Sequence, residues 1–231
     1  MSDHSAVVLL SGGIDSSTAA AIAREKGYKL HGLTFRYGQR HEAEIEAAKR
    51  VAAFLGFENH LIIDINLRTI GGSALTDDIE VPKGRNSNEI SHGIPITYVP
   101  ARNTIFLAFA LALAERNEAE NIFFGANQVD YSGYPDCREE YIHAFEQMAN
   151  LATKAGVEGR LKTKIHVPLI RMTKAEIIKK GIELRLDYAL TWSCYDPRPG
   201  GLACGRCDAC QIRLKGFQEA GWKDPIPYAH G

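Results

Sequence analysis

Apolar and polar positions change along this chain in short blocks that predict strands and helices in regular succession. An apolar strand at 7–10 runs into a glycine-rich turn at 11–16, and a run of good helix formers from 17 to 26 then ends at Gly27. The same pattern predicts the other strands at 30–35, 60–63, 121–125 and 165–169, and the other helices at 40–55, 103–114, 138–154 and 173–180.

Local signals mark several helix ends. Asn103 is placed as an N-cap, Gly56 as a stop, and Thr173 with Glu176 as a capping box. Because strand and helix alternate throughout, we expect a Rossmann-like α/β fold, with one parallel sheet and helices on both faces. Ligands of such sheets bind at the carboxyl ends of the strands. The segments expected to surround this cleft are 11–16, 36–41, 126–137 and 171–174.

The turn at 11–16 reads Ser-Gly-Gly-Ile-Asp-Ser and has the features of an anion site. Free N–H groups and the positive end of a helix dipole converge where a strand meets a helix N-terminus. Gly12 and Gly13 allow an anion to approach the backbone, and Asp15 could hold the Mg²⁺ that accompanies a nucleotide. The turn is not a Walker A loop, because no lysine occurs before Lys26.

Four of the five cysteines lie close together near the C-terminus, as Cys194, Cys204, Cys207 and Cys210. Clustered cysteines in a cytosolic chain are more often metal ligands than disulfides. Four thiolates predict a closed, structural Zn²⁺ site with one ion per subunit. The Cys-x-x-Cys-x-x-Cys spacing also suits an iron–sulfur cluster, so the sequence leaves that alternative open.

Composition limits the classes of function. The 231 residues carry a net charge of −1, which gives no electrostatic footprint for nucleic acid. The longest apolar run, 105–114, has ten residues and is too short to span a membrane. The first residues lack the pattern of a signal peptide, so we expect a cytoplasmic protein without a membrane partner.

The polar, aperiodic segment 83–93 is either a lid over a ligand or a disordered connector.

Residues 11–16 resemble the loop of the ATP pyrophosphatase (PP-loop) superfamily, which cleaves ATP between the α- and β-phosphates. Over nearly its whole length the chain resembles one branch of it, the 7-cyano-7-deazaguanine synthase family of the queuosine pathway. That resemblance rests on 11–16, 37–41, 99–103, 130–138 and the four clustered cysteines. The departures are mild: Ile14 stands where many members have Gln, and Ala101 where many have Gly.

The resemblance implies a fold like that of the adenine nucleotide alpha hydrolases over 1–190, with a four-cysteine zinc segment at 191–231 packed on the same domain. It implies an ATP-dependent ligase that turns a deazapurine carboxylate, 7-carboxy-7-deazaguanine, and ammonia into a nitrile. The intermediates would be an adenylated carboxylate and an amide. It also implies a homodimer. The residues expected to bind ATP and its Mg²⁺ are Leu10, Ser11, Gly12, Gly13, Ile14, Asp15, Ser16, Ser17, Thr18, Ala19 and Ala20.

Beyond the loop, the roles of individual residues are hypotheses. Besides Asp15, we expect Arg102 to grip the α-phosphate or the substrate carboxylate, and Lys174 to meet the β- and γ-phosphates. Two aspartates are candidates for reading the deazaguanine edge and two tyrosines for stacking on its ring: Asp130, Asp136, Tyr131 and Tyr134. Cys137 is interpreted as a buried, inert thiol rather than a nucleophile.

Two other functions fit parts of the sequence. A PP-loop enzyme that modifies tRNA, of the thiolase or lysidine synthetase type, would need a basic face that the net charge of −1 does not supply. A non-enzymatic zinc-ribbon adaptor would leave the intact loop unexplained.

An adenylation reaction needs no redox chemistry, which favours zinc over an iron–sulfur cluster. Since Ser2 is not a cysteine and Cys137 lies in the substrate loop, we expect free ammonia as the nitrogen source.

Overall fold

Five parallel strands form one sheet in the order β3-β2-β1-β4-β5. The structure is a computed structural model that describes residues 4–85, 93–127 and 134–229. The strands are β1 (Ser5–Leu9), β2 (Lys29–Arg36), β3 (Asn59–Asp64), β4 (Asn121–Phe123) and β5 (Lys164–His166). The predicted parallel sheet is therefore confirmed, and β1 lies at its centre between β2 and β4.

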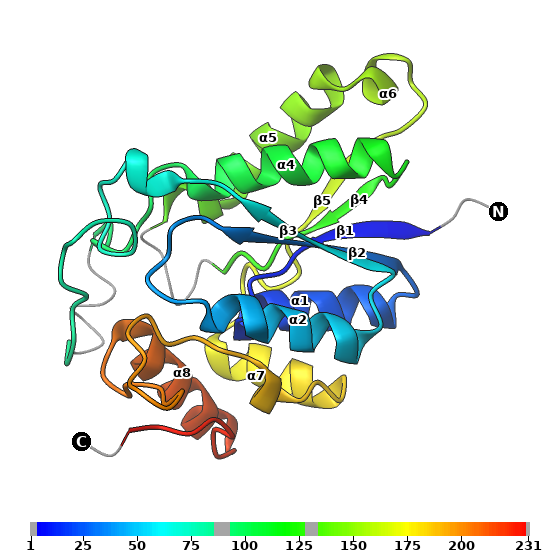
Figure 1. The fold of residues 1–231 in the computed structure, drawn as a ribbon. Coiled ribbons are helices and arrows are strands. Elements are labelled where there is room, and N and C mark those ends of the chain that lie inside the picture. The colour runs from blue at the N-terminus through cyan, green and yellow to red at the C-terminus, as the bar shows by residue number, and fades with distance from the viewer. Residues whose placement is uncertain (1–3, 86–92, 128–133, 230–231) are drawn as a thin grey trace.

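Helices cover both faces of this sheet, as predicted (Figure 1). One face is covered by α4 and α5, and the other by α1 and α2, with α7 and α8 beyond them. The helices are α1 (Ile14–Glu25), α2 (Ala43–Leu55), α4 (Arg102–Arg116), α5 (Glu139–Ala152), α6 (Lys154–Val157), α7 (Lys174–Glu183) and α8 (Asp208–Ala220). Short 3₁₀ turns are η1 (Leu67–Thr69), η2 (Pro135–Cys137) and η3 (Tyr188–Leu190).

The central strand explains why both faces need a cover. Every residue of β1 is buried, and alternate side chains point to opposite sides of the sheet. Val7 and Leu9 pack in the core beneath α4 and α5, whereas Ala6 and Val8 pack against α1, α2 and α7. The order of the strands reverses between β1 and β4, which is where a ligand crevice forms in such sheets.

Several element boundaries differ from the prediction. Helix α1 begins at Ile14, so Asp15 and Ser16 lie in its first turn rather than in the preceding loop. The predicted helix 138–154 ends at Ala152, because Thr153 is extended and its hydroxyl caps the separate helix α6. Strand β5 ends at His166, two residues before Pro168, which has no N–H to donate to a sheet. The capping box of Thr173 and Glu176 is confirmed.

The predicted N-cap of α4 is wrong. The helix begins at Arg102, and its N-cap is Ala101 in a left-handed conformation with φ of 51°. The Ala101 N–H donates to the Tyr98 hydroxyl at 3.0 Å, which helps to hold this turn. Alanine pays a steric cost in that conformation that glycine does not. Ala101 therefore stands at a position where glycine, the residue of many family members, would have a lower backbone energy.

The C-terminal segment packs against the helical layer formed by α1, α2 and α7. Its helix α8 lies against α7, and Gly216 comes so close that an added Cβ would lie 2.4 Å from Lys174 Cγ. Its cysteines share a small buried cluster with Ala47 of α2 and with Trp192. Among the described helices, none is long and apolar enough to cross a membrane.

The turn after β1 is held against α2 through a glycine. Gly12 has φ of 78°, and a Cβ there would lie 2.5 Å from Ala48 N and 2.7 Å from the Glu44 carbonyl oxygen. These are backbone atoms of a helix and cannot rotate away. Gly56 has a similar φ of 70° at the end of α2, but nothing lies within 4 Å of an added Cβ. Alanine at either position would have a strained, left-handed backbone, but only at Gly12 would it also overlap with other atoms. A comparison of the two positions therefore distinguishes the cost of backbone strain from the cost of steric overlap.

We expect Gly12→Ala to destabilise the protein more than Gly56→Ala does. Both variants pay about 1–2 kcal/mol for a left-handed alanine. Only Gly12→Ala adds an overlap with α2, which costs about 1–3 kcal/mol more. Urea unfolding of the two variants and the parent measures the difference. Equal losses of unfolding free energy would contradict the tight contact between the turn and α2.

Candidate active site

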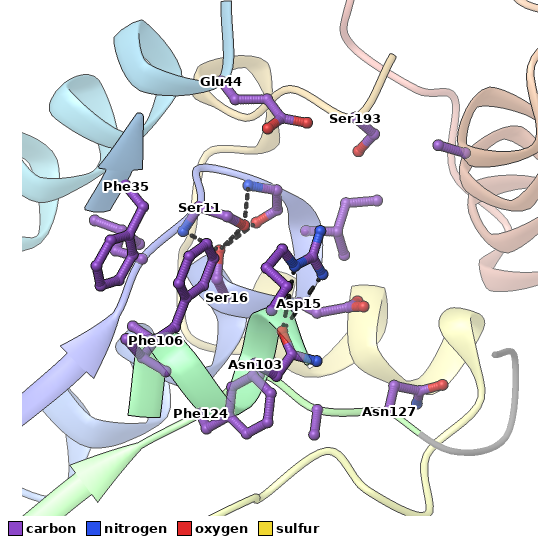
Figure 2. Close-up of a pocket in the computed structure, with 18 of the residues that line it drawn as sticks. Ser11, Asp15, Ser16, Phe35, Glu44, Asn103, Phe106, Phe124, Asn127 and Ser193 are labelled. Atoms are coloured by element: carbon purple, nitrogen blue, oxygen red, sulfur yellow. Dashed lines mark hydrogen bonds between the residues drawn. The ribbon is translucent and has the colours of Figure 1, made fainter. Parts of the chain in front are cut away.

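A cavity of about 260 Å³ opens at the carboxyl ends of β1 and β4. Residues from all four segments predicted to surround one cleft line it, so that prediction is confirmed. Figure 2 shows Glu44 and Ser193 along one side of the cavity, and Phe124 and Asn127 along the opposite side. The C-terminal segment, which the sequence placed only around a metal, also forms part of the wall through Ser193, Tyr195 and Arg213.

The turn at 11–16 forms a network of hydroxyl and N–H groups at the start of α1 (Figure 2). The Ser11 and Ser16 hydroxyls lie 2.9 Å apart, and the Ser16 hydroxyl accepts from the Ser11 N–H at 3.1 Å. The Gly13 N–H points to the Ser11 hydroxyl at 3.4 Å. The partial positive charge at a helix N-terminus lies at the same place, which is the arrangement that binds phosphate groups.

Only part of the predicted ATP loop reaches the cavity. The lining residues from this segment are Leu10, Ser11, Gly13, Ile14, Asp15 and Ser16. Gly12 instead packs on α2. Ser17, Thr18, Ala19 and Ala20 are all buried inside α1, and the Thr18 hydroxyl bonds the Tyr188 hydroxyl at 2.7 Å. A continuous run was expected, but a helix turns successive side chains away from any one site.

Asp15 and Lys174, which are far apart in the sequence, meet in the cavity. Lys174 Nζ donates to both Asp15 carboxylate oxygens at 2.6 and 2.8 Å, and the two side chains are 11% and 28% exposed, the lysine being the more buried. Asp15 comes from the first turn of α1 and Lys174 from the first residue of α7. The structure therefore brings two of the three predicted catalytic residues into contact at the phosphate end of the site.

Arg102, the third of these residues, also lines the cavity from the start of α4. Its guanidinium lies over the rings of Tyr37 and Phe106, 5.7 and 5.8 Å from their centroids. Burial would lower the pKa of Arg102, but the neighbouring hydroxyls of Tyr37 and Tyr134 outweigh it and the net shift is upward. The guanidinium is therefore a permanent cation facing the crevice.

The predicted base-reading residues have different outcomes. Tyr134 lines the cavity, whereas Asp130 and Tyr131 lie outside the described residues. Asp136 is turned inward and is 4% exposed: its two oxygens accept from the N–H and the Nδ2 of Asn103 at 3.0 and 3.1 Å. Asp136 is not among the residues that line the cavity, and its carboxylate caps the start of α4, so the expected contact with the base stays a prediction.

Cys137 lies in the cavity wall as a buried thiol. Its sulfur accepts from Asn103 Nδ2 at 3.2 Å. Burial, with a smaller contribution from the Asp136 charge, raises the pKa of Cys137 to about 12. The thiolate is the nucleophilic form of cysteine, and the raised pKa disfavours it at neutral pH. The interpretation as an inert thiol agrees with these surroundings.

Among the cavity residues that the sequence analysis did not single out, two are charged: Glu44 and Arg213. Glu44 lies in the first turn of α2, just beyond the end of β2, and burial raises its pKa to about 7 while Arg102 opposes that shift. The position after a strand end was the available signal. Arg213 is 1% exposed and donates to Asp224 at 2.7 and 3.0 Å and to the Thr191 hydroxyl at 2.8 Å. No signal in the sequence pointed to this buried pair.

The four clustered cysteines converge as predicted. Their sulfur atoms all lie within 4.8 Å of one another, and all four residues are buried. The N–H groups of Arg206 and Cys207 point to the Cys204 sulfur at 3.4 and 3.3 Å, contacts that stabilise a thiolate. One tetrahedral ion with bonds of about 2.3 Å separates its sulfur ligands by about 3.8 Å. The 3.9 Å between the sulfurs of Cys204 and Cys210 fits this geometry.

Fold and site together define an α/β protein of the class that binds nucleotides, with a turn rich in N–H and hydroxyl groups at its switch point and a four-cysteine cluster whose geometry suits a metal ion. A family model described as queuosine biosynthesis protein QueC matches residues 5–221. The chain belongs to the queuosine biosynthesis protein QueC family.

Relatives of this chain carry one name. The 7-cyano-7-deazaguanine synthase of Desulfatibacillum aliphaticivorans is 64% identical over 96% of this chain and 96% of its own length. The 7-cyano-7-deazaguanine synthase of Paramagnetospirillum magneticum is 63% identical over 97% of this chain and 98% of its own. Among solved structures, the NMN synthetase from Francisella tularensis superposes with a TM-score of 0.50 at 17% identity. The match covers 96% of this chain and 79% of that one, and shows a shared fold.

Proposed function

We infer that this chain is an ATP-dependent ligase that converts 7-carboxy-7-deazaguanine and ammonia to 7-cyano-7-deazaguanine in queuosine biosynthesis. The single observation that carries this conclusion is the 64% identity to a 7-cyano-7-deazaguanine synthase over nearly the full length of both chains. The phosphate loop, the cations and the aromatic walls of the cavity suit such a reaction, which needs a nucleotide and a planar base in one crevice.

The chemistry explains why ATP is needed. A carboxylate is a poor electrophile, so its oxygen attacks the α-phosphorus and forms an acyl-adenylate as pyrophosphate leaves. Ammonia displaces AMP from the acyl carbon and gives an amide. The amide oxygen then attacks a second ATP, and loss of AMP with the remaining N–H protons leaves the nitrile. Both adenylation steps build negative charge on the departing pyrophosphate, which fixed positive groups stabilise.

The cavity contains positive and hydrogen-bond-donating groups that could stabilise this charge. We propose that the N–H groups at the start of α1 and the hydroxyls of Ser11 and Ser16 bind the departing pyrophosphate. Lys174 lies at the same end of the site and Arg102 faces it from α4, in position for the α-phosphate or the substrate carboxylate. Asp15 is the carboxylate there that would hold Mg²⁺, which shields phosphate charge when it is bound.

Replacing Asp15 tests the loop directly. We expect Asp15→Asn to lower turnover about 100-fold or more, because the phosphates lose their metal-binding carboxylate and Lys174 loses its partner. ATP–pyrophosphate exchange in the presence of 7-carboxy-7-deazaguanine is the measurement. Asp64→Asn is the control, since that carboxylate is 70% exposed and pairs with Arg36 on the surface. Release of ADP and phosphate by the parent, instead of AMP and pyrophosphate, would contradict the assignment.

We propose that the four-cysteine centre holds one Zn²⁺ ion and has a structural role. A closed set of four buried thiolates leaves no position for a substrate, as structural zinc sites do. An iron–sulfur cluster would spread its cysteines over separate iron atoms, which the close approach of these sulfurs disfavours. The segment beyond residue 190 also contributes to the cavity wall, so we propose that 191–231 is a metal-stabilised extension of the domain at 1–190.

We expect the removal of one cysteine ligand to lower both the zinc content and the thermal stability of the protein. Cys207→Ser should bind less than about 0.2 zinc ions per chain and unfold at a lower temperature, since metal binding and folding of such centres are coupled. Cys137→Ser should keep its full zinc content, because Cys137 is buried elsewhere. Elemental analysis with thermal unfolding measures both. A purified parent that contains iron and sulfide, or a Cys207→Ser protein as stable as the parent, would refute the zinc centre.

We propose that nitrogen arrives as free ammonia. A glutaminase site of the cysteine type needs a reactive thiolate. Four of the five cysteines converge on the metal centre, and the thiol of Cys137 is buried and has a pKa raised to about 12. The resemblance further implies a cytoplasmic homodimer, and we retain both as proposals.

Ammonium is therefore expected to support nitrile formation by the purified protein, and glutamine freed of ammonia is not. Product formation is followed by mass spectrometry with ¹⁵N-ammonium or with glutamine labelled in its amide. A glutamine-dependent rate equal to the ammonium-dependent rate would contradict this expectation. Repeating the glutamine reaction with Cys137→Ser would then show whether that thiol is the nucleophile.

A further inference from the structure

Glu44 is a carboxylate that faces the cavity without a donor from the described part of the protein. It lies in the first turn of α2, and the contact of Gly12 with the Glu44 carbonyl oxygen holds that turn against the phosphate loop. Figure 2 shows its side chain directed into the cavity from the side that carries Ser193. Among residues 4–85, 93–127 and 134–229, no hydrogen bond or ion pair to this carboxylate occurs.

The other carboxylates near the described part of the cavity are already engaged. Asp15 is bound by Lys174 at 2.6 Å, and both oxygens of Asp136 accept from Asn103. Glu44 is half-buried in the cavity wall, and the partial desolvation of its unpaired carboxylate raises its pKa. A ligand that brings hydrogen-bond donors to Glu44 would offset this desolvation on binding.

The substrate has the matching donors. A 7-deazaguanine base presents its N1–H and its 2-amino group side by side on one edge, and a carboxylate can accept both bonds at once. We propose that Glu44 binds this edge and selects a base that carries a 2-amino group. The proposal rests on the proposed function and deepens it, because it assigns the base-reading carboxylate of the same site.

The arrangement of charges around Glu44 agrees with such a pose. The 7-carboxylate lies on the far side of the bicyclic ring from the N1 and 2-amino edge. Arg102 faces the same cavity and is close enough to influence Glu44 without forming an ion pair with it. A base held between them would direct its edge to Glu44 and its carboxylate to Arg102 and the phosphate loop. Tyr37, whose ring lies beneath the Arg102 guanidinium, adds an aromatic surface to the cavity wall.

The test compares two substrates in three proteins. The substrates are 7-carboxy-7-deazaguanine and the analogue without the 2-amino group, 7-carboxy-7-deazahypoxanthine. The proteins are the parent, Glu44→Gln, and the control Glu46→Gln, whose carboxylate lies on the same helix but is 53% exposed and pairs with Lys49. Glutamine keeps the shape of the side chain, but its amide N–H₂ would face the donors of the base. ATP–pyrophosphate exchange gives kcat/KM for each pair.

We expect the parent and Glu46→Gln to prefer the guanine substrate by about 100-fold, since a site built to accept a hydrogen bond rejects the analogue that lacks its donor. Glu44→Gln should lose about 100-fold on the guanine substrate and only a few-fold on the analogue, so the preference disappears. Its loss should appear in KM and in the Kd measured by calorimetry.

Three results would overturn the proposal. The parent could accept both substrates equally, which requires no variant to interpret and which a misfolded Glu44→Gln cannot mask. Glu44→Gln could retain the full preference. The variant could also lose kcat equally on both substrates with KM unchanged, which would assign Glu44 to proton transfer. Failure of the parent to exchange pyrophosphate with either base would instead contradict the proposed function.

Discussion

The close contact between the phosphate turn and its neighbours is the constraint on which the site depends. Gly12 lies against the backbone of α2, and Gly125 at the end of β4 lies so near the start of α1 that a Cβ would be 2.8 Å from Ser16 N. Side chains at these positions would push apart the elements that carry the polar groups. Because both contacts are made by backbone, the N-terminus of α1 points into the crevice with little freedom to move.

The C-terminal segment with its four-cysteine cluster packs on this frame and supplies one wall of the crevice. Arg213 on α8 is almost fully buried, and its guanidinium bonds Asp224 as well as Thr191, which lies just before the wall residue Ser193. Breaking a buried ion pair leaves an uncompensated charge, so this pair holds α8 to the chain that follows it. Arg213 also donates to the Tyr188 carbonyl at 3.1 Å, which ties α8 to the turn η3. The four-cysteine cluster therefore bears on the site through packing, since the segment that carries it also forms one wall of the cavity.

Local pattern predicted the sheet, the turn between β1 and α1 and the convergence of the four cysteines, because each depends on neighbours in the sequence. What the local pattern did not show has the opposite origin. An aspartate in a polar loop suggests a ligand, but Asp136 also accepts a bond from Asn103, 33 positions away, and this bond could not be read from the sequence around it. Glu44 was missed, since its burial depends on the turn at Gly12 and on α4 rather than on the residues beside it. Tertiary contacts of this kind leave no periodic signal.

The surroundings of Cys137 keep its thiol from reacting with the intermediates of the proposed reaction. An acyl-adenylate and a nitrile are both electrophiles, and a thiolate in the cavity wall would capture either of them. Burial raises the pKa of Cys137, and the Asp136 carboxylate beside it raises it further. The same carboxylate caps α4 through Asn103 and so places Arg102 at the crevice. Asp136 thus bears on the site in two ways: it helps to position the Arg102 cation, and its charge adds to the effect of burial on the pKa of Cys137.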